Sequence, residues 1–204
     1  MAKKKMSKVK AAKKKPARPV KKVRAKSPAK KAAPAAMDQE AMMAAWQKAM
    51  TPGAGHQRLE PMVGTWHART TFTVSPEAPS EVSEATSENR WVLGGRQLEQ
   101  RYQGIMMGMG FEGLGYTGYD NVQGKYVGTW MDTFSTGMMS SISVGKPTDT
   151  VIASEADSIE PSGKRVHFWC EVRIQDRDHH TFEMWTKAPN GRRFRTMLIE
   201  YSRQ

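Results

Sequence analysis

The side chains best suited to hold a small molecule are charged and aromatic residues in the middle of the chain. They are Trp66, Arg90, Trp91, Arg96, Glu99, Arg101, Tyr102, Glu112, Tyr116, Trp130 and Asp132. Paired charges beside aromatic walls are the usual composition of a small-ligand site, so we interpret this set as the lining of a binding pocket. The structural alternative is that an arginine stacks on a tryptophan and closes the end of a barrel.

The residues that could bind a metal or catalyse a reaction form weaker patterns. The candidate metal ligands are His167, Cys170, His179 and His180. Positions 167 and 170 fall on opposite faces of a strand, which argues against a shared metal. His67 is an alternative, through which a barrel could hold haem. Because no nucleophile motif is present, we predict no catalytic residues, no metal site and no cofactor, and we favour a binding protein over an enzyme.

Two overlapping Gly-x-Gly-x-x-Gly matches run from Gly108 to Gly113 and from Gly113 to Gly118. A dinucleotide site needs a helix after the glycines, whereas this segment is strand-like and runs into a turn. We therefore interpret Gly113 and Gly115 as positions where a strand bends or leaves room for a ligand. Six methionines between 106 and 139 are interpreted as packing residues rather than Cu(I) ligands.

The elements that must position these side chains are β-strands. Val-Gly-Thr-Trp occurs twice, at 63–66 and 127–130, and about ten strand-like segments follow one another from residue 62 to 204. Turn sequences separate them, of which Asn190-Gly191 gives the strongest hairpin signal. Alternation over residues 166–174 places Cys170 on the buried face. These patterns predict an all-β fold, an antiparallel up-and-down barrel, because closure removes exposed strand edges.

Four motifs resemble a known family in order and spacing. They are Met62-Val-Gly-Thr-Trp66, Arg90-Trp-Val-Leu-Gly-Gly-Arg96, Phe111-Glu-Gly-Leu-Gly-Tyr-Thr-Gly-Tyr-Asp120 and Tyr126-Val-Gly-Thr-Trp-Met-Asp132. The chain from His56 onward resembles the bacterial domain-of-unknown-function family 1579. The resemblance implies a lipocalin-like, calycin-type barrel with no established activity, so it supplies no catalytic residues.

A basic tail precedes the barrel. Residues 1–36 contain 15 of the 32 Lys and Arg residues and no acidic residue, whereas the remaining 168 residues are mildly acidic. This Lys-, Ala- and Pro-rich composition predicts disorder and resembles histone-like tails. We expect the tail to bind nucleic acid or another polyanion through Lys3, Lys4, Lys5, Lys13, Lys14, Lys15, Arg18, Lys21, Lys22, Arg24, Lys30 and Lys31. The alternatives are a solubilising extension and a nuclear-import signal.

Residues 37–61 are predicted to form a helical segment and linker between the tail and the barrel domain. Asp38 is placed to cap a short helix, and 51–55 to end it. Its methionines and Trp46 recur at helical spacing, which favours a helix packed on its own domain over one that grips a partner. The single cysteine excludes an intrachain disulfide, and neither a signal peptide nor a membrane span is evident. We therefore expect a cytoplasmic protein, which the basic tail would associate with the nucleoid.

The leading functional hypothesis combines these parts. The barrel is expected to bind a small, partly apolar ligand, while the tail holds the protein near nucleic acid. Two alternatives remain open at this stage: an interaction module whose barrel binds no ligand, and an enzyme that uses the mouth of the barrel.

Overall fold

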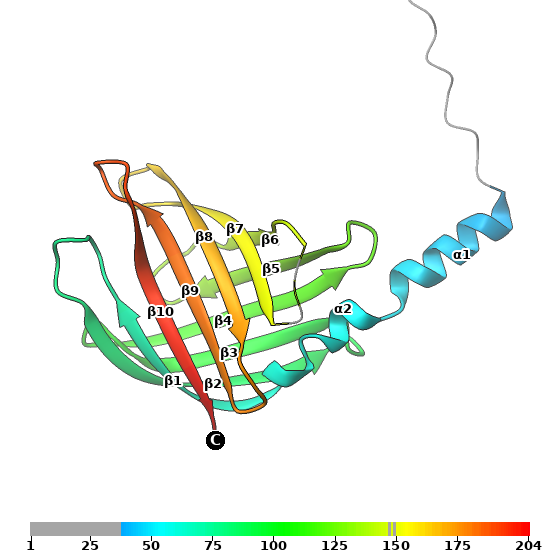
Figure 1. Ribbon diagram of the computed structural model, residues 1–204, viewed down its shortest axis with the longest axis horizontal. Coiled ribbons are helices and arrows are strands. Elements are labelled where there is room, and N and C mark those ends of the chain that lie inside the picture. The colour runs from blue at the N-terminus through cyan, green and yellow to red at the C-terminus, as the bar shows by residue number, and fades with distance from the viewer. Residues whose placement is uncertain (1–37, 147, 149) are drawn as a thin grey trace, which may run out of the picture. The chain divides into compact units, whose positions relative to one another are not determined.

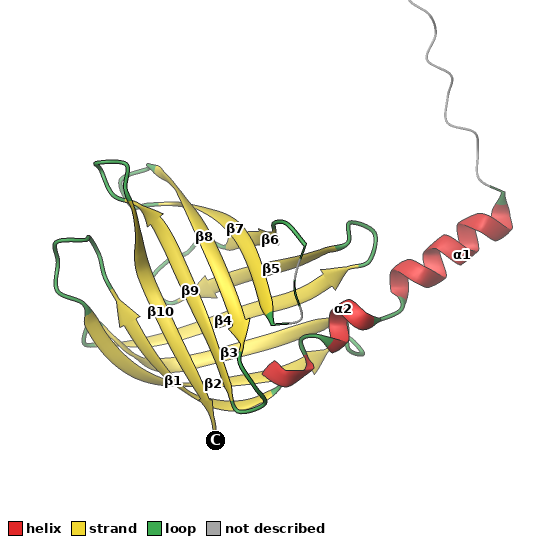
Figure 2. Ribbon diagram, viewed as in Figure 1, coloured by secondary structure: helices red, strands yellow, loops and turns green. Residues whose placement is uncertain are grey.

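The computed structural model describes residues 38–204 except 147 and 149, so the predicted basic tail lies outside the described residues. Three short helices come first: α1 (Gln39–Met50), α2 (Ala54–Gln57) and the 3-10 helix η1 (Glu60–Met62). Ten strands follow, as Figure 2 shows: β1 (Gly64–Phe72), β2 (Glu81–Val92), β3 (Gln97–Met106), β4 (Met109–Asp120), β5 (Lys125–Asp132), β6 (Met139–Ser143), β7 (Val151–Ile159), β8 (Arg165–Ile174), β9 (His179–Lys187) and β10 (Arg193–Arg203).

The strands form one closed antiparallel barrel in which each strand pairs with its neighbours in the chain and β1 pairs with β10 (Figure 1). This arrangement confirms the predicted up-and-down barrel of about ten strands. The 188–192 turn joins β9 to β10, and Gly191 adopts a φ of 81° there, which a residue with a side chain rarely takes up. The predicted hairpin at Asn190-Gly191 is therefore confirmed.

The core lies inside the barrel, where side chains of alternate residues meet. One cluster contains Trp66, Tyr102, Phe111 and Tyr201, with Trp130 packed against it. The indole of Trp130 lies directly over β4, because a Cβ added at Gly113 would come within 2.2 Å of that ring and one at Gly115 within 2.8 Å. The alternating glycines thus leave room for a side chain of the protein itself.

One end of the barrel is sealed by the segment that precedes β1. Leu59 is completely buried there, packed in a second cluster with Leu98, Tyr126 and Ile152. The ring of Tyr119 leaves no space for a side chain at residue 55, and the Tyr126 hydroxyl donates to the Gly55 carbonyl at 2.9 Å. We call this the sealed end; the turns at 73–80, 107–108, 133–138, 160–164 and 188–192 surround the opposite end.

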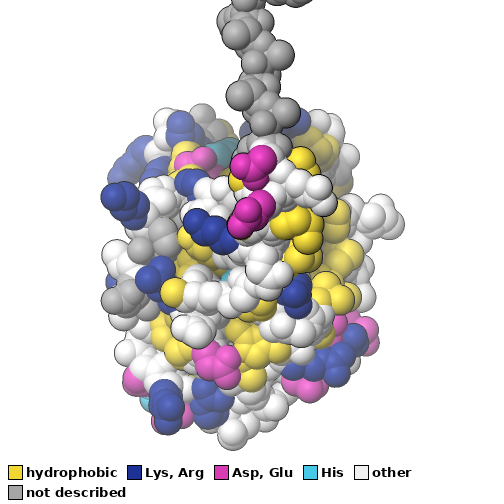
Figure 3. Space-filling model, turned by 90° about the vertical axis from the view of Figure 1, so that its right-hand side faces the viewer, with side chains coloured by type: hydrophobic (Ala, Val, Ile, Leu, Met, Phe, Trp, Pro, Cys, Tyr) yellow, Lys and Arg dark blue, Asp and Glu magenta, His cyan; other side chains and the backbone are white. Residues whose placement is uncertain are grey.

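Helix α1 does not pack on the barrel as predicted. Asp38 caps it as expected, accepting from the Ala41 amide at 2.7 Å, but no residue of the helix is buried. Trp46 is 60% exposed, and Figure 3 shows hydrophobic side chains uncovered on this side of the molecule. The Asn121 amide donates to carbonyls at the end of the helix, including that of Thr51 at 2.8 Å. The packing prediction is wrong, because the stripe of Met42, Met43, Trp46 and Met50 stays 46–64% exposed.

None of the helices within residues 38–204, positions 147 and 149 aside, has the length and apolarity that crossing a membrane requires.

Candidate functional site

The predicted pocket residues divide between the two faces of the barrel wall. The inward-facing members are Trp66, Trp91, Tyr102, Trp130 and Asp132. The outward-facing members are Arg90, Glu99, Arg101, Glu112 and Tyr116, and Arg96 lies in the 93–96 turn. The prediction that all of them line one interior is therefore wrong for the outward-facing group, since a shift of one residue in register exchanges the two faces.

The outward-facing charges form a compact cluster around Glu99. Its carboxylate accepts from Arg101 Nε at 2.8 Å and Arg90 Nε at 3.0 Å, and from the Tyr116 hydroxyl at 3.0 Å. The hydrogen bond from Arg101 is the largest of the effects that hold the pKa of Glu99 below its ordinary value. Because the side chain of Glu99 is only 6% exposed and fully partnered, this cluster stabilises the wall and leaves the carboxylate no free acceptor for chemistry.

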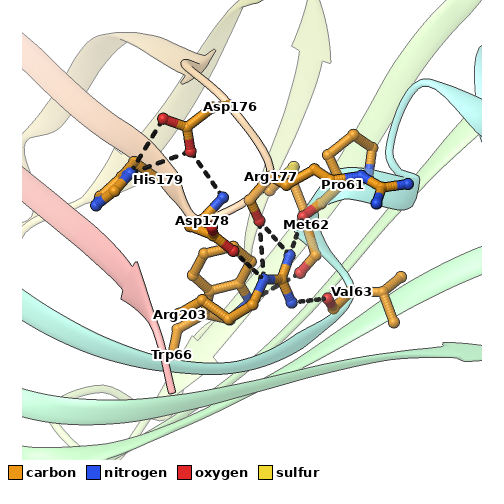
Figure 4. A network of polar contacts seen from close by, with 9 residues as sticks. All are labelled: Pro61, Met62, Val63, Trp66, Asp176, Arg177, Asp178, His179 and Arg203. Carbon is orange, nitrogen blue, oxygen red and sulfur yellow. Dashed lines mark hydrogen bonds and ion pairs between the residues drawn. The ribbon is translucent and has the colours of Figure 1, made fainter.

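An arginine that was absent from the predicted site closes the sealed end. The guanidinium of Arg203 stacks on Trp66, with Cζ 4.2 Å from the ring centroid. Figure 4 shows how it also donates to surrounding carbonyls, including those of Val63 at 2.8 Å and Pro61 at 2.9 Å. An ion pair of 3.2 Å with Asp178 completes the network. This contact realises the structural alternative, an arginine stacked on a sealing tryptophan.

His180 lies inside the barrel next to this network and is chemically unusual. Its ring stacks on Tyr201 at 4.3 Å between centroids and meets the edge of Trp66 at 4.3 Å. Among the described residues neither ring nitrogen has a hydrogen-bond partner, although His180 is only 2% exposed. Burial, and secondarily the charge of Arg203, lowers the pKa of His180 to about 4. The imidazole is therefore neutral at physiological pH.

Several other polar groups inside the barrel are partnered. Thr70 and Tyr102 share a hydrogen bond of 2.7 Å between their hydroxyls. The Gln100 amide donates to Ser87 at 2.9 Å and to the Tyr201 hydroxyl at 3.2 Å. Burial raises the pKa of Tyr201 well above its ordinary value. These hydroxyls and the Gln100 amide are polar groups of the interior that remain uncharged.

The inner wall formed by β7 to β10 carries side chains that are only partly buried. They are only partly buried although each of these strands is paired with another strand on both sides. Among these side chains are Ser154, Ser158, Phe168, Phe182, Met184, Met197 and Ile199. We call the space that these side chains enclose the lumen. Its walls on this side are mainly apolar, with two serine hydroxyls, and Phe182, Met197 and Ile199 pack against the core cluster. Sequence alternation identifies such residues strand by strand, but only pairing shows that they face one another.

A second hollow of about 850 Å³ lies on the outer wall, across β4 to β8. Tyr116, Thr129, Ile142, Glu155 and His167 are among its lining residues. Of the predicted pocket residues, only Tyr116 lines it. Most of its lining side chains face outward, including Tyr116, Glu155 and His167, and it includes none of the partly buried residues of the lumen named above.

The histidines and cysteine considered as metal ligands do not converge. His167 pairs with Asp157 at 3.0 Å and His179 with Asp176 at 3.0 Å, both on the outside. His180 and Cys170 face inward, and burial raises the pKa of the Cys170 thiol to about 12. Among the described residues, no three His, Cys, Asp or Glu side chains come close enough to hold a metal ion.

His67 and the glycine motifs have ordinary structural positions. His67 faces outward and lies 2.9 Å from Glu84, away from the lumen where haem would bind. Both Gly-x-Gly-x-x-Gly matches fall in β4 and the turn before it, and a hairpin to β5 follows them. The helix N-terminus that would hold a pyrophosphate is therefore absent after these glycines in the described chain.

The comparisons with known proteins agree with the barrel fold. A family model described as "Protein of unknown function (DUF1579)" matches residues 51–203, as the sequence motifs predicted. Among solved structures, the chain is similar to Rv2717c from M. tuberculosis, with 19% identity and a TM-score of 0.55 over 76% of this chain and 99% of that chain. This likeness shows the fold alone.

Two further barrels match less well. A redesigned β-barrel, b11L5F_LGL, has 12% identity and a TM-score of 0.38 over 74% of this chain and 95% of that chain. EF1p2_mFAP2b bound to DFHBI has 10% identity and a TM-score of 0.40 over 74% of this chain and 100% of that chain. A search of curated proteins found no match.

Proposed function

The chain belongs to the DUF1579 family, whose function is unknown, and from its own geometry we propose that the barrel binds a small, neutral and partly apolar molecule in its lumen. The observation that carries this proposal is the set of partly buried, inward-facing side chains on β7 to β10. Phe168, Phe182 and Met184 offer aromatic and thioether surface, which adapts to apolar ligands. Ser154 and Ser158 add hydroxyls that can orient a polar substituent.

The charge distribution favours a neutral ligand. The clustered arginines of the predicted pocket lie on the outer wall, where Arg90 and Arg101 already serve Glu99. Within the described strands, the middle of the inner wall carries no charged side chain. A charged ligand would lose its hydration in the lumen without gaining a counter-ion, which is unfavourable.

The lumen is a better candidate than the hollow on the outer wall. A ligand gains most when it is largely enclosed, and lumen walls surround a molecule on several sides. The outer hollow is open, and carboxylates such as Glu155 and Asp157 lie at its edge.

A pair of matched variants tests this proposal with N-phenyl-1-naphthylamine, a neutral apolar probe whose fluorescence rises in apolar surroundings. Ser154→Phe places a ring in the lumen, whereas Ala153→Phe places the same ring on the outer face of the same strand. We expect saturable probe binding to the wild type and to Ala153→Phe, and at least a tenfold loss with Ser154→Phe. Thermal unfolding of each variant checks the fold. Equal binding by both variants, or no binding to the wild type, would contradict the lumen proposal.

Native mass spectrometry of protein purified from its own host would identify the natural ligand. The expected result is a fraction of the protein with an added mass that disappears when the protein is partly unfolded. The same experiment on Ser154→Phe should show less of the bound species.

A separate proposal concerns the basic tail, which would bind polyanions by neutralising phosphates and releasing counterions. The density of charge supports it, because 15 Lys or Arg residues fall within residues 1–36 without any acid. Removal of these residues should abolish retention on DNA, and added salt should weaken binding of the full chain steeply. Equal retention without the tail, or binding that salt does not affect, would contradict this proposal.

A further inference from the structure

Two tryptophans lie side by side on the outer wall of the barrel. Trp169 on β8 and Trp185 on β9 are direct partners across the two strands. Their neighbours Cys170 and Met184 face the interior, so both indoles face outward, where they are partly exposed. Two large aromatic rings next to each other on a water-facing wall offer partly exposed aromatic surface.

Cationic side chains of β9 and β10 flank this pair on one side. Arg193 Cζ lies 4.2 Å from the ring centroid of Trp169 and 6.0 Å from that of Trp185. Arg195 Cζ lies 5.9 Å from Trp185, and Lys187 Nζ lies 5.8 Å from Trp169. All three cations are exposed to solvent. We call these five residues the Trp–Arg wall.

Two of the three cations retain free donors. Arg195 is paired with Glu183 at 3.3 Å. Within residues 38–204, leaving out 147 and 149, no carboxylate lies within ion-pair distance of Lys187 or Arg193. Their N–H groups rest near aromatic faces, which accept no strong hydrogen bond, and so remain available to an anion.

We propose that the Trp–Arg wall binds single-stranded nucleic acid. Bases would stack on Trp169, Trp185 and the planar guanidinium of Arg193, while phosphates would meet the ammonium and guanidinium donors. Stacking platforms beside cations are the general means by which proteins hold single strands without reading their sequence. Glu155 and Asp157 on β7 border the tryptophan pair on the other side, so the phosphates would follow β9 and β10 toward Arg192.

This inference goes beyond the proposal for the tail and stands independently of it. The tail contains no aromatic residue, so it can neutralise phosphates but cannot stack on bases. A polyanion without bases would therefore engage the tail alone, and only a nucleic acid would engage the Trp–Arg wall as well. The two proposals can fail separately.

Photo-crosslinking of the full chain to an oligouridylate that contains 4-thiouridine tests the location. We expect crosslinked peptides from β8 and β9 that contain Trp169 or Trp185. Crosslinks confined to residues 1–36, or to parts of the barrel away from these strands, would overturn the proposal.

Affinity measurements with matched variants test the mechanism. The double change Trp169→Ala and Trp185→Ala should weaken binding of the oligouridylate about tenfold, since stacking of a single base commonly contributes that much. Binding of heparin, which has no bases, should stay unchanged. The double change to Phe should preserve most of the affinity because a phenyl ring still stacks, and Trp46→Ala, which removes an exposed tryptophan from α1, should have no effect.

Each remaining outcome is decisive. Unchanged oligouridylate affinity in a folded Ala double variant would exclude stacking on this wall. An equal loss of affinity for heparin and oligouridylate would identify a general anion surface and would also overturn the proposal. The same holds if the Phe double variant has a wild-type thermal unfolding curve but binds oligouridylate as weakly as the Ala double variant. If heparin does not bind the full chain while the crosslinks to β8 and β9 persist, the tail proposal fails and this one stands.

Discussion

Replacement of His180 by phenylalanine should stabilise the barrel. The imidazole is buried with both nitrogens unpartnered, and each unsatisfied buried polar group costs about 1–3 kcal/mol. A phenyl ring can keep the stacking on Tyr201 and the edge contact with Trp66. It is slightly larger than imidazole, and repacking consumes part of the gain. We therefore expect the free energy of unfolding at pH 7 to rise by about 1–2 kcal/mol.

The same substitution should change how stability depends on pH. The pKa of His180 is about 4 in the folded state, against 6.5 ordinarily, so the unfolded chain takes up a proton at a higher pH than the folded chain does. The part of the wild-type stability that depends on a neutral His180 is fully present above pH 6.5 and is lost as the pH falls toward 4. A difference of this size corresponds to about 3 kcal/mol by linkage. The phenylalanine variant lacks this group and should lose correspondingly less over the same range.

Urea unfolding at several pH values between 4 and 7.5, followed by circular dichroism, measures both effects. The control is His179→Phe, which changes the adjacent, exposed histidine that pairs with Asp176. Its pH dependence should follow the wild type, because a surface ion pair of this kind contributes about 0–1 kcal/mol. Destabilisation of His180→Phe at pH 7, with wild-type pH dependence, would show that the imidazole nitrogens have partners in solution and would refute the reasoning.

Three further changes test the packing of the barrel. Arg203→Lys keeps the charge but loses the planar fork over the sealed end, and should lower the free energy of unfolding in urea by about 2 kcal/mol. Glu99→Gln should cost about 1–2 kcal/mol at pH 7, by the loss of charge-assisted hydrogen bonds. Because the folded pKa of Glu99 is lowered, this difference from wild type should shrink as the pH falls below the ordinary glutamate range. Gly113→Ala should cost about 1–3 kcal/mol and alter the near-ultraviolet circular dichroism of Trp130, which must move; unchanged spectra would contradict that packing.

The architecture could be predicted because it depends on local patterns. Alternation over 166–174 correctly places Cys170 on the buried face of β8, and Asn190-Gly191 correctly marks a hairpin. Each of the ten segments needs a paired strand on both sides, and no helix is long enough to cross between them. A closed barrel meets this need because it leaves no unpaired strand edge. The helix at 39–50 was also predictable from its cap, although its position off the barrel was not, because propensity does not show which surfaces lie near one another.

The site could be predicted only in part, because it depends on register. Glu99 and Tyr102 are three residues apart on β3, so one faces outward and the other inward, and no property of either residue reveals which. Arg203 meets Val63 across 140 residues, and this contact exists only because closure pairs β1 with β10. The sequence supports the idea that an arginine seals a tryptophan, but only the paired strands identify the arginine.

The two candidate binding surfaces share the same strands, which provides a test of the barrel as a two-sided wall. Along β8, Phe168 and Cys170 face the lumen, while Trp169 faces outward as part of the Trp–Arg wall. Consecutive side chains on a strand point in opposite directions, so a change on one face should leave the chemistry of the other intact. Ser154→Phe should therefore abolish probe binding without loss of oligouridylate affinity, and the Ala double variant of the wall should do the reverse. If both changes weakened both ligands, the strands would be responding as one deformable unit, and neither surface could be assigned to a face.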